Sequence, residues 1–361
     1  MLKTIDPALR RQLAVTAAAL AGYCLGTNIP LPGLDAAALA QAGHQDTEAI
    51  ARLSVLAIGI MPLLNAMILF EVARLLLPAI RRWEAAKPRN ANRMWLALVG
   101  LSMLLALIQA GGLATALEDV GGLVVEPGHA FRTVTIATLV AGSVVTIALM
   151  IVIDTAGTGF GLWLLFLASG LTELPRTVAG LTLATATGEY DATSLLLTLA
   201  FAALAIAAVV NLVIAARAAA PMIHSTLWTP IIALAAITPA MFMLGLFATW
   251  STDRATDIAL PGSALWYVGL AVVVAFVVWL YRRSYAAAGI ALPVPPAPII
   301  ASLAGIIIGG ALIEQYLAVV PPLGGTQLII AATVGAAMLM QWKKGERPIS
   351  LPDGTDSSRA A

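Results

Sequence analysis

The side chains in this sequence that could do catalysis or bind a metal are few and lie far apart. Three histidines, His44, His129 and His224, fall in expected loops, and none has the spacing of metal ligands. Cys24 is the single cysteine, so the chain can form neither an internal disulfide nor a cysteine metal site. We therefore expect no catalytic residue, no metal and no cofactor, and we predict that the protein is not an enzyme.

Charged residues at membrane depth would indicate a small-molecule carrier. Glu71 and Arg74 lie one helical turn apart, late in an apolar segment. Their simpler interpretation is an ion pair near the membrane interface, with long side chains that reach for water. No apolar segment has a carboxylate near its centre, as a proton- or sodium-coupled carrier would need. The sequence therefore gives little support to a small-molecule transporter.

The composition indicates a membrane protein. Hydrophobic residues make up 60% of the 361 residues and charged residues 11%, whereas soluble domains have about half and about a quarter. Because a span needs about 20 residues, the chain has room for about ten helices with short loops. We predict an all-α polytopic membrane protein with spans at 13–31, 53–80, 94–117, 133–153, 160–174, 194–216, 228–247, 264–280, 299–317 and 326–340.

Short or interrupted spans at matching positions of two halves are typical of inverted repeats. The ten predicted spans are compatible with two pseudo-symmetric halves of five helices each. The N-terminal half is 1–174, with a short polar, alanine-rich segment at 36–52 between its first two spans. An external hinge loop at 175–193 leads to the C-terminal half, 194–342, and 343–361 is predicted to be a disordered cytoplasmic tail.

Lysine and arginine residues set the predicted orientation, because they accumulate in cytoplasmic loops. With the N-terminus in the cytoplasm, all but four of the 20 lysines and arginines fall on the cytoplasmic side. The four on the outer side are Arg52, Arg132, Arg176 and Arg254. Both termini are therefore predicted to lie in the cytoplasm, which requires an even number of spans.

The second span, within Leu53–Glu71, is interrupted by Gly59 and Pro62. Proline removes a backbone donor and clashes with the preceding turn, so the helix must bend there or begin late. In lipid, such a break is tolerated only against other protein or a water-filled cavity. We therefore expect this segment to be buried in protein or to line a central path.

Six motifs, in chain order, resemble those of the SecY family of protein-conducting channels. They are Gly26–Asp35, Leu56–Pro62, Ala106–Gly111, Gly157–Gly161 with Gly170–Pro175, Ser225–Phe242, and Gly324–Ile330. The resemblance implies a channel subunit for translocation or membrane insertion of unfolded polypeptides. It also implies a bacterial cytoplasmic (inner) membrane location, nascent-chain clients, a small SecE-like partner with or without a SecG-like one, and no nucleic acid.

The resemblance also implies the residues of a pore ring and a lateral gate. An apolar constriction holds back water and ions by dewetting and still yields to a large guest. The pore ring carried over by motif is Ile60, Leu64, Phe166, Met241 and Ile330. The lateral-gate candidates are Asn65, Gln109 and Thr238, for which ordinary interhelical hydrogen bonding is an equal alternative.

Two departures from the family pattern point to a shortened, divergent member. The segment 36–52 is shorter than the family's plug and lacks its aromatic, glycine-rich sequence. The cytoplasmic loops 215–225 and 281–298 are also short, with Arg282 and Arg283 as the cytoplasmic contact candidates. These short loops argue against docking of the usual motor ATPase or ribosome. The alternative function is a non-conducting or specialised insertion factor or scaffold.

Overall fold

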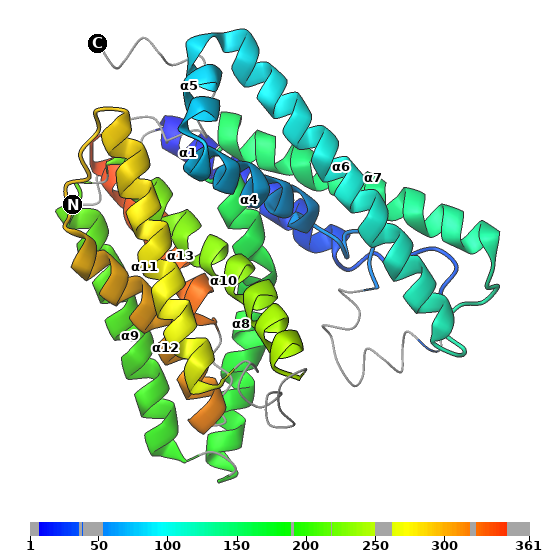
Figure 1. Ribbon diagram of the computed structural model, residues 1–361. Coiled ribbons are helices and arrows are strands. Elements are labelled where there is room, and N and C mark those ends of the chain that lie inside the picture. Colours follow the sequence, from blue (N-terminus) through cyan, green and yellow to red (C-terminus); the bar gives the residue numbers. More distant parts are fainter. Residues whose placement is uncertain are drawn as a thin grey trace. The chain divides into compact units, whose positions relative to one another are not determined.

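The computed structural model describes residues 7–35, 38, 53–188, 191–217, 219–249, 262–317 and 323–344. The plug-like segment 36–52, apart from residue 38, and the tail beyond 344 lie outside these residues. The described elements are helices: α1 (Pro7–Gly26), α4 (Met61–Leu76), α5 (Pro78–Ala86), α6 (Pro88–Asp119), α7 (His129–Ala156), α8 (Gly161–Ala186), α9 (Ala192–Ala215), α10 (Ala220–Thr249), α11 (Ala264–Ala287), α12 (Pro296–Leu317) and α13 (Gly325–Lys344) (Figure 1).

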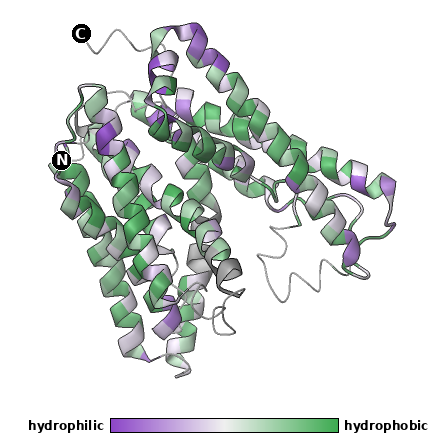
Figure 2. Cartoon of the chain, viewed as in Figure 1, coloured by the Kyte–Doolittle hydropathy of each residue, from purple (hydrophilic) through white to green (hydrophobic). Residues whose placement is uncertain are grey.

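The lengths and hydrophobicity of these helices confirm an all-α multi-pass membrane protein. Among the described residues, six helices are long and apolar enough to cross a membrane, namely α6, α7, α9, α10, α11 and α12, and the bent pair α4–α5 makes a seventh if it counts as one span. Residues of high hydropathy make up most of the length of the helices (Figure 2). The remaining expected spans correspond to α1, α8 and α13.

The chain divides into two compact units. The first contains residues 1–73, 79–169 and 348–361, and the second contains 74–78 and 170–347. The first unit thus includes α1, α5, α6, α7 and most of α4. The second includes α9 to α13 and the later part of α8. The predicted boundaries at 174 and 194, and the inverted symmetry, stay predictions.

In the first unit, α7 is the central helix, since α6 and α1 both pack against it. Small residues on α6 recur every four positions, at Ser102, Ala106, Ala110 and Ala114, and all are buried. Small side chains let two helices approach closely where lipid supplies no hydrophobic drive for their association. The apolar core of this unit is Leu31, Leu34, Leu53, Ile58, Ala110, Leu117, Phe131 and Leu139.

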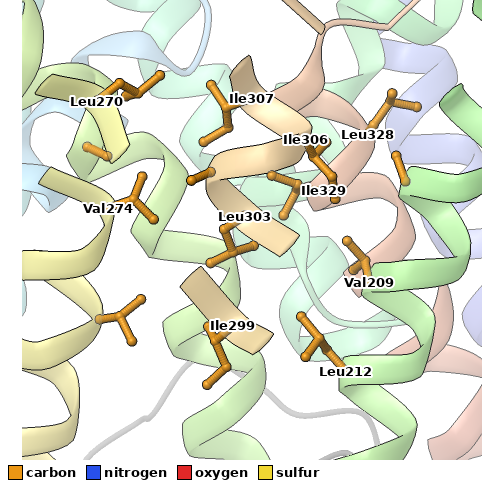
Figure 3. Close-up of a cluster of buried hydrophobic side chains, with 14 of the residues drawn as sticks. Val209, Leu212, Leu270, Val274, Ile299, Leu303, Ile306, Ile307, Leu328 and Ile329 are labelled. Carbon is orange, nitrogen blue, oxygen red and sulfur yellow. The ribbon is translucent and has the colours of Figure 1, made fainter. Parts of the chain in front are cut away.

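In the second unit, α12 packs among α9, α10, α11 and α13. Its buried residues Ile299, Leu303, Ile306 and Ile307 meet Val209 and Leu212 of α9, Leu270 and Val274 of α11, and Leu328 and Ile329 of α13 in one core (Figure 3). A Cβ on Gly325 would lie 2.5 Å from the Ile306 carbonyl oxygen. The absence of a side chain at Gly325 therefore lets the start of α13 approach α12.

The second expected span differs from a continuous helix over 53–80. Residues 53–60 are irregular, α4 begins only at Met61, and the chain bends by 103° between α4 and α5. Pro62 therefore lies in the first helical turn, where its missing N–H has no intrahelical acceptor to lose. Of the two outcomes predicted for this proline, the late helix start is the one observed.

The fifth expected span is longer than predicted. Helix α8 continues to Ala186, so residues 175–186, expected to begin the external hinge loop, are helical. The stretch Thr177–Ala186 is itself an apolar helix. Alanine and leucine make up half of this stretch, and both residues favour helix.

Candidate functional site

The irregular segment before α4 is held by the turn that follows α1. Residues Pro30 and Ser54 form an antiparallel β-bridge. The Leu31 N–H donates to the Leu53 carbonyl at 2.9 Å, and the Val55 N–H donates to the Ile29 carbonyl at 2.9 Å. These bonds pair backbone N–H and C=O groups that lie outside any helix. Buried backbone groups need such hydrogen-bond partners.

The same turn is also paired with the loop after α6. Leu34 and Val124 form a second antiparallel bridge, and the Asp35 N–H donates to the Leu123 carbonyl at 2.9 Å. Gly33 has φ +86°, and a Cβ there would lie 2.9 Å from the Phe131 ring. Glycine is needed at this position both for its backbone conformation and for the contact with Phe131.

Two small residues allow the irregular segment to be buried. A Cβ on Gly142 of α7 would overlap the Val55 carbonyl oxygen, and a Cβ on Gly26 of α1 would overlap the Leu56 side chain. The segment thus lies against the backbones of both helices. This meets the requirement that non-helical backbone at membrane depth be covered by protein.

This support positions two of the pore-ring candidates. Gly59 has φ +54°, and the Ile60 carbonyl then accepts the Leu64 N–H at 3.0 Å, which begins α4. Ile60 is 4% exposed and Leu64 is 2% exposed. Ile60 therefore lies directly before α4, and Leu64 lies in the first turn of that helix.

The junction between α7 and α8 positions Phe166. Asp154 accepts the Gly161 N–H at 2.6 Å, and Phe160 has the unusual φ of +59°. A Cβ on Gly161 would overlap the Met150 carbonyl oxygen, so α8 begins directly against α7. Phe166 follows within two turns and is half-buried.

The other two pore-ring candidates belong to the second unit. Met241 is buried in the core of that unit, and its Cε lies 2.6 Å from where a Cβ on Gly269 would stand. Ile330 is fully buried in α13. Ile60, Leu64 and Phe166 lie in the first unit. The ring as a whole therefore stays a prediction.

The lateral-gate candidates differ in exposure. Asn65 and Gln109 are half-buried in the first unit, whereas Thr238 is exposed in the second. The Thr238 hydroxyl donates to the Leu234 carbonyl of its own helix at 3.0 Å. This bond is the ordinary role of a threonine in a membrane helix. The gate role of these three residues also stays a prediction.

The cytoplasmic contact candidates are engaged within their own unit. Arg282 Nη1 donates to the Val294 carbonyl at 2.8 Å, which closes the connection between α11 and α12. The Arg283 guanidinium lies 5.5 Å from the centre of the Trp279 ring, within cation–π range. Arg283 is exposed and Arg282 is half-buried. Their role in partner contacts stays a prediction.

The sequence reasoning missed a buried ion pair. Arg81 Nη2 lies 3.4 Å from Glu71 Oε1, and Glu71 is only 2% exposed. The sequence paired Glu71 with Arg74 by helical spacing. The bend between α4 and α5 returns Arg81, ten positions later, to the same carboxylate. Leu77-Pro78 was the signal for this bend, since a helix ends before proline.

Nothing in the described part of the chain forms a group of three or more metal-ligating side chains. His224 lies in α10 rather than in the expected loop. His224 packs against Trp228 and Tyr281, with ring centres 6.1 Å and 5.9 Å apart.

About half of the chain is similar in sequence to SecY proteins. A family model described as SecY matches residues 54–226. The protein translocase subunit SecY of Buchnera aphidicola subsp. Acyrthosiphon kondoi is 31% identical over 188 residues, covering 47% of this chain and 52% of that protein. The same subunit of Escherichia coli (strain K12) is 30% identical over 188 residues, covering 47% and 42%. The chain spans about half the length of the curated relatives it matches.

Solved structures show the same fold over nearly the whole chain. A structure described as that of a protein conducting channel has a TM-score of 0.58 at 12% identity, covering 95% of this chain and 94% of that one. Sec61 in the canine ribosome-channel complex from the endoplasmic reticulum has a TM-score of 0.59 at 13% identity, with the same coverage. The predicted all-α fold is confirmed and is SecY-like, whereas the inverted symmetry of its two halves stays a prediction. These names describe translocase subunits and channels, in agreement with the prediction of a non-enzymatic protein.

Proposed function

We propose, from its similarity to SecY proteins and its SecY-like fold, that this chain is a channel subunit for unfolded polypeptides. Its clients would cross the membrane or leave sideways into lipid. The observation that carries the proposal is the buried irregular segment 53–60, which the α1 turn and α7 hold in place. It places Ile60 directly before α4 and Leu64 in the first turn of α4, where both apolar side chains are buried.

The proposed pore ring is Ile60, Leu64, Phe166, Met241 and Ile330. An apolar ring suits this function because it excludes water by dewetting and offers a passing chain no hydrogen bonds to hold it. The proposed lateral gate contains Asn65, Gln109 and Thr238. A side-chain hydrogen bond between membrane helices contributes only about 0.6 kcal/mol on average. A few such bonds can therefore hold the seam closed and still let it open.

We further propose a bacterial cytoplasmic (inner) membrane location with both termini in the cytoplasm, as the distribution of lysine and arginine favours. Small membrane subunits of the SecE and SecG type are the proposed partners, and the lipid bilayer is the surrounding medium. The partners are proposed by analogy with the family. The chain itself spans about half the length of the curated relatives.

A specialised insertion factor or scaffold is the second candidate, and two observations favour it. Helix α9 ends at Ala215 and α10 begins at Ala220, which leaves only a tight turn with Arg217 at φ +51°. Arg282 is held against the Val294 carbonyl. The cytoplasmic connections of the second unit are therefore short and closed on themselves, which leaves little chain for a motor ATPase or a ribosome to grip.

Site-specific photocrosslinking in cells separates the two functions. A photoreactive amino acid would replace Phe166 to probe the pore and Asn65 to probe the gate. Leu204, which is 71% exposed, would be the control position. The channel proposal expects secretory and membrane-protein chains to be trapped from Phe166. Trapping of membrane proteins from Asn65 alone would favour the insertion factor.

The control site defines the background, because Leu204 should yield chiefly lipid adducts. If expressed and correctly inserted protein trapped no polypeptide from either Phe166 or Asn65 above the Leu204 level, both the channel and the insertion proposals would be contradicted. The scaffold would then remain as the better account of the chain.

A further inference from the structure

A pocket opens between the first turn of α11 and the last turns of α12, at the end of α11 opposite Arg282. Its volume is about 380 Å³, within the range of small-ligand sites. The residues that line it are Gly262, Trp266, Tyr267, Ala311, Glu314 and Gln315. All belong to the second unit, and none is a proposed pore or gate residue.

The aromatic wall of the pocket is held rigidly. Ser263 caps α11 by accepting the Trp266 N–H at 3.2 Å. The Trp266 and Tyr267 rings meet edge to face, with centres 5.2 Å apart at 80°. The Tyr267 hydroxyl donates to Gln315 Oε1 at 2.6 Å, which joins α11 to α12 across the pocket. The two rings therefore keep their positions without a ligand.

The charge of the pocket comes from Glu314. This residue is exposed, and among the described residues no lysine or arginine forms an ion pair with it. A carboxylate beside two aromatic rings attracts a positive charge in two ways, by direct electrostatics and by the negative faces of the rings. An anionic group would be repelled by Glu314, and a purely apolar one would gain no electrostatic attraction from it.

We propose that this pocket binds an organic ammonium group. Two sources share this chemistry: the headgroup of a zwitterionic lipid and a free amine in solution. The surroundings favour the lipid, because Leu265 and Val268, beside the pocket on α11, are 39% and 61% exposed and offer a surface for acyl chains. Tryptophan and tyrosine are also the residues that membrane proteins place at headgroup depth. The inference does not depend on the channel function.

Lipid retention by the full chain tests the proposal. The protein would be reconstituted with equal amounts of dioleoyl-phosphatidylethanolamine and dioleoyl-phosphatidylglycerol, which differ only in the headgroup, then delipidated and examined by native mass spectrometry. The wild type should retain phosphatidylethanolamine over phosphatidylglycerol. Glu314→Gln and Trp266→Leu should each lower this ratio about fivefold, the factor that one lost cation contact of about 1 kcal/mol gives.

Matched controls separate the pocket from general effects. Glu126→Gln removes an exposed carboxylate in the first unit, and Trp95→Leu removes an exposed tryptophan there; neither should change the ratio. Glu314→Gln alters an exposed side chain, so its fold should be retained even if Trp266→Leu is unstable.

Calorimetric titration of the lipid-free protein in detergent with tetramethylammonium chloride distinguishes the two sources. Binding that Glu314→Gln weakens, without any lipid preference in the wild type, would assign the pocket to soluble amines. A lipid preference that Glu314→Gln abolishes would assign it to the headgroup. The proposal is overturned if wild type, Glu314→Gln and Glu126→Gln retain the two lipids in the same ratio and tetramethylammonium does not bind.

Discussion

The side-chain oxygen of Thr16 in α1 accepts a hydrogen bond from the backbone N–H of Thr158 at 2.9 Å. The two hydroxyls lie 3.1 Å apart, and both residues are buried. A Cβ on Gly157 would stand 2.5 Å from the same Thr16 oxygen, so glycine is what permits the approach. The junction that begins α8, and that positions Phe166, therefore depends on a residue 142 positions earlier.

Thr16→Val should destabilise the protein by about 1–3 kcal/mol, because it leaves the buried Thr158 N–H without its acceptor. Thermal unfolding in detergent measures the effect. Thr115→Val is the matched control, since the Thr115 hydroxyl is exposed and bonds only to the Gly111 carbonyl of its own helix. Equal unfolding temperatures for the two variants would contradict the proposed role of Thr16.

Gly142→Ala should disturb the irregular segment before α4, because the new Cβ would overlap the Val55 carbonyl oxygen and backbone cannot easily yield. Overpacking of this kind costs about 1–3 kcal/mol. Gly100→Ala in α6 meets nothing within 4 Å and should instead stabilise its helix slightly, by roughly 0.5–1 kcal/mol. The unfolding temperatures of the two variants should move in opposite directions. A Gly142→Ala protein as stable as wild type would show that α7 does not support the segment.

Arg81→Met should destabilise the protein more than Arg82→Met does, because it removes a partner of the buried Glu71 carboxylate. The expected difference is about 1–3 kcal/mol, below the cost of breaking a fully buried pair since Arg81 is 25% exposed. The double variant Glu71→Gln/Arg81→Met should recover much of the loss, since no charge is left buried. Additive effects of the two substitutions in unfolding measurements would rule out their coupling.

Ile60→Ser should raise ion leak if Ile60 belongs to an apolar constriction, because a hydroxyl lets water enter the narrowest part of the path. Single-channel or vesicle-flux recordings of the purified protein measure the leak. Ile60→Val keeps the surface apolar and should leave the leak at the wild-type level. An unchanged leak in Ile60→Ser, in protein shown to be folded, would count against the pore ring.

Arg282→Gln should loosen the connection between α11 and α12, because it removes the bond to the Val294 carbonyl. Protease cleavage within 288–295 should become several-fold faster, as local opening costs about 1 kcal/mol less. Arg283→Gln is the natural comparison, since Arg283 stacks on Trp279 of its own helix. Identical cleavage of the two variants would show that Arg282 does not close this loop.

Much of the fold was predictable from local properties of the chain. The spans followed from runs of apolar residues, because the bilayer demands a fixed length of hydrophobic helix wherever the chain crosses it. The interruption at Pro62 was also predictable, since proline acts on its own turn and the turn before it. The predicted end of the fifth span was wrong, because residues 175–186, expected to begin a loop, continue the helix α8.

The candidate site was only partly predictable. Ile60 and Leu64 could be named from their motif, but the reason for their position, a buried irregular segment supported by Gly26 and Gly142, required the structure. The pair Glu71–Arg81 could not be found by helical spacing, because a 103° bend separates the two residues. The pocket at Trp266 and Glu314 is likewise lined by residues of two helices, and the sequence does not show which residues of α11 and α12 face each other.

An all-α membrane protein with an interrupted second span follows from the amino-acid sequence alone, because hydrophobicity and proline act through neighbouring residues and the surrounding solvent. Packing in the folded chain sets which distant groups meet: Thr16 with Thr158, Glu71 with Arg81, and Tyr267 with Gln315. Such pairings depend on helix rotation, bend angles and close approach at single glycines. These are collective properties of packing, and no local stretch of sequence contains them.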